Sequence, residues 1–303
     1  MKFVSVIGPK GSGKTTVAVN VAACLANEKN PKTGKNNRVL LVDANANCGA
    51  TEALGYHMFN TEGEELIDSM CSSVMLYNPN FHFLKDIIFG TDHDEPIQEL
   101  PTLHLIPGHA KLYEEDRKQA RYRDVKERKN YGSGWPLSRC LRNSIDVVRE
   151  YDTMVFDLGS TINQTTFSTM VFSEVILIVM KPTYEDLEVS TALINAYERR
   201  LEDEGIDVKR DKEIIVNGYN DRRTIDKEVL DILNGKATEN SSKYDDLEGL
   251  YNNGIPIRKS VRIDEAMEAE TPLIVMNEDR YAEVRSDFQK LTRKLAENSL
   301  LLE

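Results

Sequence analysis

The first sixteen residues constrain the fold more than any other stretch of the chain. Residues 3–7 are apolar except for Ser5, and the run ends abruptly in Gly8, which predicts a short buried strand. Residues 8–15 then fit the spacing G-x-x-x-x-G-K-[ST], in which glycines let successive backbone N–H groups surround a polyphosphate. Apolar residues follow at helical spacing over 17–25, so the N-terminus of a helix would face the same anion. Strand, glycine loop and helix together predict a nucleoside triphosphate site.

Individual loop positions have expected roles. Lys14 would place its amine on the β- and γ-phosphates, and the Thr15 hydroxyl would ligate Mg²⁺. The residues expected to surround the nucleotide are Gly8, Pro9, Lys10, Gly11, Ser12, Gly13, Lys14, Thr15 and Thr16.

Two further runs end in an acid. Residues 38–42, apolar after Arg38, precede Asp43, and residues 153–156, apolar after Thr153, precede Asp157. The carboxyl ends of parallel strands line the ligand crevice of an open sheet, so both acids are expected to contact Mg²⁺, directly or through water. A simpler alternative for Asp43 is a cap for the small polar loop that follows it.

Asn217 ends another predicted strand, at 213–217, where its amide can pair with the donor and acceptor edge of an adenine. ATP and Mg²⁺ are therefore the expected cofactors. Strands are also predicted at 103–107, 174–180 and 255–257, with helices at 137–150, 184–202 and 281–297.

This alternation predicts an α/β fold, a doubly wound and mostly parallel sheet with helices on both faces. The chain shows no internal repeat and no long linker, so residues 1–303 are expected to form a single P-loop ATPase domain. Residues from about 57 to 135 carry no clear pattern and resemble an insert.

Composition narrows the function classes. The net charge of −12 argues against a broadly basic surface but does not exclude a local basic patch, which is what nucleic-acid binding needs. The four cysteines include no C-x-x-C pair, which favours reduced thiols in a cytoplasm over disulfides or a zinc site. No apolar run has membrane-spanning length. The charged run 111–129 fits either a solvated helix with charge pairs or a surface for nucleic acid or a partner.

Several separated stretches resemble the ParA/MinD partition and positioning ATPases, whose phosphate loops are deviant. The resemblance runs from residue 3 to about 295, interrupted from about 57 to 135. The matching segments are 38–43 with 49–51, 151–157, 174–188, 219–229 and 255–272.

The resemblance implies an ATP-sandwich homodimer that binds nonspecific DNA on the nucleoid, with a ParB-like adaptor that stimulates hydrolysis. It implies plasmid or chromosome partition as the function. Arg222, Arg223, Arg258 and Arg262 fall on segments that contribute DNA-contacting basic residues in partition members. Contacts of this kind would read phosphates, not bases, and would weaken steeply with salt. Ordinary solubilising arginines are the alternative.

Two departures concern catalysis, for which the expected residues are Lys14, Lys10, Asp43 and Asn45. Members of the family usually carry a lysine second in the loop, whereas this chain has Pro9 there and a lysine third, at Lys10. They also carry an acid two residues after the equivalent of Asp43, where this chain has Asn45. An amide can orient water but cannot accept its proton, so ATP hydrolysis is expected to be slow.

Other functions on the same fold stay open. A MinD-like ATPase would need a C-terminal amphipathic helix, but residues 291–303 hold few bases and no bulky aromatic, so they make a poor membrane anchor. A cargo-positioning ATPase would share every partition feature. A metabolic ligase or reductase component is the third class.

Overall fold

One parallel sheet organises the part of the chain that the computed structural model describes, which is residues 1–30, 32–57, 88–90, 97–109, 112, 144–236, 244, 247, 250–251 and 254–297. Its seven strands are ordered β3-β2-β4-β1-β5-β6-β7, and every neighbouring pair is parallel. The predicted doubly wound sheet is confirmed. The strands are β1 (Lys2–Ile7), β2 (Val39–Ala44), β3 (Leu103–Ile106), β4 (Thr153–Leu158), β5 (Val175–Met180), β6 (Asp211–Tyr219) and β7 (Ile257–Arg258).

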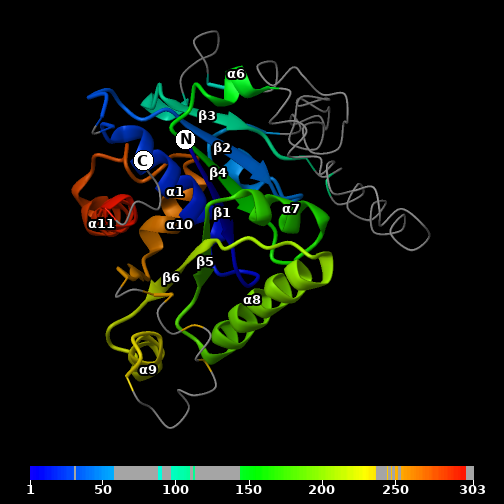
Figure 1. The fold of residues 1–303 in the computed structure, drawn as a ribbon. Helices are drawn as coiled ribbons and strands as arrows, with labels where there is room; N and C mark the ends of the chain where they lie inside the picture. Colours follow the sequence, from blue (N-terminus) through cyan, green and yellow to red (C-terminus); the bar gives the residue numbers. More distant parts are fainter. Residues whose placement is uncertain are drawn as a thin grey trace.

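Helices cover both faces of this sheet (Figure 1). One face carries α1 (Lys14–Asn27), α10 (Val261–Glu268) and α11 (Ala282–Glu297), and the other carries α7 (Gln164–Phe172) and α8 (Tyr184–Glu204). Apolar side chains of α9 (Thr224–Leu233) join the core on the α7 and α8 side. Shorter elements are α2 (Gly49–Glu52), α6 (Ile145–Val148), and the 3-10 turns η2 (Ile97–Glu99) and η5 (Asp279–Tyr281).

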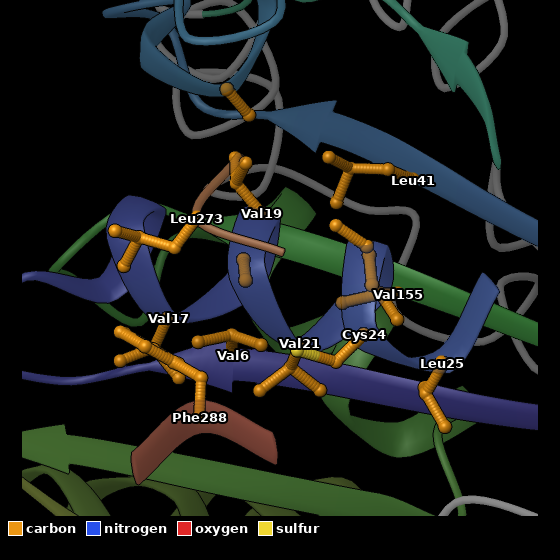
Figure 2. Close-up of a cluster of buried hydrophobic side chains, with 14 of the residues drawn as sticks. Val6, Val17, Val19, Val21, Cys24, Leu25, Leu41, Val155, Leu273 and Phe288 are labelled. Carbon is orange, nitrogen blue, oxygen red and sulfur yellow. The ribbon is translucent and has the colours of Figure 1, made fainter. Parts of the chain in front are cut away.

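The core on the α1 side explains why that helix forms directly behind the glycine loop. Every residue from Val17 to Ala26 is buried, because strands lie on one side of α1 and α11 lies on another. Val6, Leu41 and Val155 of three adjacent strands point toward Val17 and its neighbours, as Figure 2 shows. A helix that is apolar nearly all round is stable only inside such a core. The start of α1 is therefore held rigidly at the carboxyl end of β1.

Sequence and structure differ at the end of β6. The strand was predicted to end at Asn217 but continues to Tyr219, because β7 pairs beside it with a register shift between those two residues. Gly218 lies between them with a φ of 80°, a left-handed conformation suited to glycine. Such a bulge leaves little trace in apolar periodicity.

Some sequence predictions fall outside the described residues. The charged run 111–129 does so except for Leu112, and so does the predicted helix 137–150 before residue 144. Of the insert-like region, 88–90, 97–109 and 112 are described. None of the described helices is both long enough and apolar enough to span a membrane.

Candidate nucleotide-binding site

The conformation of the phosphate loop depends on two glycines. A Cβ on Gly8 would lie 1.9 Å from the carbonyl oxygen of Val179 in β5, and one on Gly13 would lie 2.1 Å from Nδ2 of Asn217 in β6. Gly13 also has a φ of 88°. Real Cβ atoms do not approach other atoms so closely, so both positions require glycine. The loop is thus packed directly against the carboxyl ends of two neighbouring strands.

Lys14, the first residue of α1, crosses back over the loop. Its Nζ donates a hydrogen bond of 2.9 Å to the carbonyl oxygen of Pro9. The side chain is buried, and burial lowers the pKa of the amine, while the carboxylates of Asp157 and Asp186 act in the opposite direction. A bound polyphosphate would add negative charge beside this amine and favour its protonated form.

Thr15 and Asp157 form the second part of the site. The Thr15 hydroxyl donates to Oδ2 of Asp157 over 2.7 Å, and the other carboxyl oxygen, Oδ1, is buried without a hydrogen-bond partner among the described residues. Burial, reinforced by the nearby Asp43, raises the pKa of Asp157 to about 8. An orphaned buried oxygen and a crowded acid are the features that a cation would relieve.

Asp43 lies beside Asp157 because β2 and β4 pair with these two residues in register. Burial raises its pKa to about 6, opposed by hydrogen bonds from the Thr51 side chain and from backbone N–H groups. A hydroxyl, one or two carboxylates and nucleotide phosphates are the usual ligands of Mg²⁺ in proteins. The residues present therefore fit Mg²⁺, with Thr15 and Asp157 as direct ligands or through water.

Both oxygens of Asp43 accept hydrogen bonds from the segment after β2, which comprises a short loop and α2. Oδ2 accepts from the backbone N–H of Thr51 at 2.9 Å and from its hydroxyl at 2.7 Å, and Oδ1 accepts from Asn45 N–H at 3.2 Å. The capping role that the sequence left open for Asp43 is therefore present in the structure. It does not exclude a contact to metal-bound water.

Thr51 and Gly108 are parts of this site that sequence reasoning did not identify. The Thr51 hydroxyl accepts a 2.8 Å hydrogen bond from Gly108 N–H. A Cβ on Gly108 would lie 2.8 Å from the carboxyl carbon of Asp43. Gly108 follows β3, which lies beside β2, so the contact arises from strand order and has no local sequence signal.

The side chains of Asn217 and Asn45, for which the sequence predicts roles in nucleotide binding and hydrolysis, each form a hydrogen bond within the protein. Asn217 Nδ2 donates to the carbonyl oxygen of Ser12 over 2.8 Å, so the side chain connects β6 to the loop, and its Oδ1 is buried with no hydrogen-bond partner in the described part of the chain. Oδ1 of Asn45 accepts from Asn47 N–H at 3.1 Å. Adenine recognition by Asn217 and water orientation by Asn45 stay predictions.

Lys10 and Gly11 are exposed at the outer rim of the loop, and Ser12 is buried inside it. Thr16, in the first turn of α1, is partly buried, and its carbonyl oxygen accepts a hydrogen bond from Asn20 Nδ2 at 2.9 Å.

The four arginines lie near the β6–β7 edge, since Tyr219 of β6 pairs with Arg258 of β7. Arg258 is held by Asp287 at 2.6 and 3.0 Å and by Glu283. Arg262 pairs with Glu265, and Arg223 lies 3.4 Å from Asp226. Among the described side chains none forms an ion pair with exposed Arg222. Contact of these arginines with DNA stays a prediction.

Fold and site together define a class, the P-loop nucleotide-binding proteins built on a doubly wound parallel sheet. Residues 1–207 match the family model described as an AAA domain, which is of the ParA/MinD type. This match spans more than half of the chain. The chain belongs to the ParA/MinD family of P-loop ATPases, as its sequence resemblance indicated.

Solved structures of low sequence identity share the fold over nearly the whole chain. McdA from Cyanothece matches with a TM-score of 0.67 and 15% identity, over 97% of this chain and 99% of that chain. Cobyrinic acid a,c-diamide synthase from Mycobacterium smegmatis, with bound ADP and magnesium, matches with a TM-score of 0.63 and 15% identity, over 99% and 96%. A plasmid partition protein from Borrelia burgdorferi bound to AMPPNP matches with a TM-score of 0.60 and 19% identity, over 97% and 98%. At these identities the likeness shows the fold alone.

Proposed function

We propose that this protein is a ParA-like ATPase that forms an ATP-sandwich dimer, binds nonspecific DNA and drives plasmid or chromosome partition with a ParB-like adaptor. The observation that carries the proposal is the complete phosphate loop, with Lys14, Thr15 and Asp157 converging at the start of α1. A second observation supports it: Arg222, near the β6–β7 edge of the sheet, is exposed. The protein would act in the cytoplasm, on the nucleoid.

In this proposal the loop would hold Mg²⁺–ATP. Loop N–H groups and the Lys14 amine would bind the phosphates, and Thr15 with Asp157 would hold Mg²⁺, whose charge would stabilise the phosphates during transfer. Structures of McdA with ATP and of the Borrelia partition protein with AMPPNP support triphosphate use on this fold. The positive charge of Mg²⁺ would also favour loss of the proton that the Asp43–Asp157 pair otherwise retains.

Hydrolysis is expected to be slow without a partner. Asn45 stands where family members carry an acid, and its side-chain oxygen is engaged with Asn47 N–H at 3.1 Å. Phosphoryl transfer depends mainly on positioning and charge stabilisation, so the amide would slow the reaction without abolishing it. Binding of the adaptor would then help to orient the attacking water and so accelerate hydrolysis.

DNA binding would use arginines that remain available. Arg222 is exposed, and Arg262 is only half-buried beside Glu265. Arg258 is the weaker candidate because Asp287 and Glu283 already satisfy its guanidinium. On a chain of net charge −12 such a patch would be confined, and binding would fall steeply as salt rises.

The experiment is DNA binding with ATP, with ADP and without nucleotide, over a salt series, using duplexes of unrelated sequence. We expect binding only with ATP, equal affinity for unrelated sequences, and a smaller salt slope for Arg222→Ala, by roughly one unit. Lys14→Ala, which removes the phosphate-binding amine, should abolish the ATP effect. Equal binding in all three nucleotide states would defeat the proposal, and ATP-dependent binding to liposomes in place of DNA would indicate the membrane-positioning class.

A further inference from the structure

A lysine outside the phosphate loop lies directly beside it. Nζ of Lys181 lies 3.8 Å from the position that a Cβ on Gly11 would take. Gly11 has a φ of 74° and, like Lys181, is exposed. Because Gly11 has no side chain, nothing of its own separates the lysine amine from the outer backbone of the loop.

The backbone around Lys181 fixes the position from which this amine reaches the loop. Its N–H donates to Oδ2 of Asp186 at 2.7 Å, and its carbonyl oxygen accepts from Thr183 N–H at 2.8 Å. The next residue, Pro182, is buried and restricts the residue before it to extended conformations. The backbone of Lys181, from which its side chain extends, is therefore held by hydrogen bonds at both its N–H and its carbonyl group.

The end of β5, which precedes Lys181, packs directly against the start of the phosphate loop. Lys181 directly follows β5, and the carbonyl oxygen of Val179 in β5 fills the space beside Gly8 where a Cβ would lie. The distance between the end of β5 and the loop is thus set by backbone packing and not by a flexible contact.

The charges around the loop suit an anion beside Lys181. Asp186 interacts electrostatically with both Lys14 and Lys181. No described side chain forms an ion pair with the Lys181 amine. An exposed lysine beside a phosphate loop, whose amine forms no ion pair with a described side chain, is available to a polyphosphate.

We propose that Lys181 is a binding residue for the triphosphate, supplying from the end of β5 the positive charge that Pro9 cannot supply from the second loop position. Lys10 is the alternative lysine, and it is exposed within the loop itself. This inference rests on the proposed nucleotide site and adds a residue to it.

The test is equilibrium binding of AMPPNP with Mg²⁺ to the full chain, measured by calorimetry at several salt concentrations. Lys181→Ala should weaken binding roughly tenfold to a hundredfold, the usual range for one charge-assisted contact, and should reduce the salt dependence. Lys181→Arg should recover most of the affinity because it keeps the charge. The backbone N–H to Asp186 is unchanged in these variants, so the melting temperature should stay at the wild-type value.

Lys209→Ala is the matched control, since Lys209 is an exposed lysine just before β6, at the opposite end of the sheet. It should bind AMPPNP as the wild type does. If Lys181→Ala binds like Lys209→Ala, the role assigned to Lys181 is wrong while the nucleotide site stands. If the wild type itself fails to bind AMPPNP, the proposed function fails first. A loss of affinity in Lys10→Ala but not in Lys181→Ala would transfer the role to Lys10 and overturn the inference.

Discussion

At the scale of single residues, the most unusual feature is a pair of buried carboxyl groups on neighbouring strands. Asp43 and Asp157 are opposite each other in the β2–β4 ladder and both are fully buried. Two like charges cannot both be accommodated there without compensation, and the pKa values are raised to about 6 for Asp43 and about 8 for Asp157. Without a cation the pair therefore retains a proton near neutral pH.

This proton retention predicts how stability depends on pH. An unfolded Asp releases its proton near pH 4, so between about pH 4 and pH 8 the folded nucleotide-free protein binds more protons than the unfolded chain. The free energy of unfolding should fall as pH rises through that window. Asp157→Asn keeps an oxygen for the Thr15 hydroxyl and removes the charge, so at pH 8.5 it should be more stable than the wild type by about 1–3 kcal/mol.

Urea unfolding of nucleotide-free protein at pH 5.5 and pH 8.5 measures the effect, as the difference between variant and wild type. Asp203→Asn, at the exposed end of α8, is the control and should follow the wild type at both pH values. A stability difference that is the same at pH 5.5 and pH 8.5 would show that the pair holds no additional proton.

At the scale of elements, α11 is fastened to the edge of the sheet through Arg258. This residue of β7 donates from its backbone N–H, at 3.2 Å, and from its guanidinium to Asp287 of α11, whose side chain is only 7% exposed. Hydrogen bonding to Asp287 raises the pKa of the guanidinium above its ordinary value. Since β7 pairs only briefly with β6, this contact helps to hold the end of the sheet.

Arg258→Ala should therefore destabilise the fold more than it affects DNA contact. We expect a loss of about 1–2 kcal/mol in the free energy of unfolding, a modest value because the arginine is 43% exposed and solvent screens the pair. Arg222→Ala should change stability by less than about 0.5 kcal/mol, as surface substitutions do. Thermal unfolding of both variants measures this difference. Equal melting temperatures for Arg258→Ala and Arg222→Ala would contradict a structural role of Arg258.

The elements themselves were largely predictable, whereas the contacts between them were not. Apolar runs ending at Ile7, Asp43 and Asp157 predicted the strands, because buried parallel strands leave a continuous apolar signature. The bond from Thr51 to Gly108 and the place of Lys181 beside Gly11 join segments far apart in the sequence. They depend on strand order, which periodicity along the chain does not encode.

At the scale of the whole molecule, strand order brings the site to the carboxyl ends of the central strands. β1 lies at the centre, with β4 on one side and β5 on the other, so residues that follow all three meet around one loop. Lys10 and Gly11 stay exposed at the rim of that loop. An exposed rim around a triphosphate leaves room for a second copy of the chain to cover it, and the nucleotide would then be shared between two subunits.

We predict that the 34.4 kDa chain doubles in mass when saturated with AMPPNP and Mg²⁺, and stays single with ADP or without nucleotide. The physical reason is that the γ-phosphate adds charge at the exposed rim, where a second subunit can contribute contacts that ADP does not offer. Light scattering after size-exclusion chromatography measures the mass directly. Lys14→Ala should stay monomeric because it loses the amine that crosses the loop to Pro9. A wild-type chain that binds AMPPNP and remains a monomer would leave the fold and the nucleotide site intact, but it would exclude an ATP-dependent dimer as the DNA-binding form.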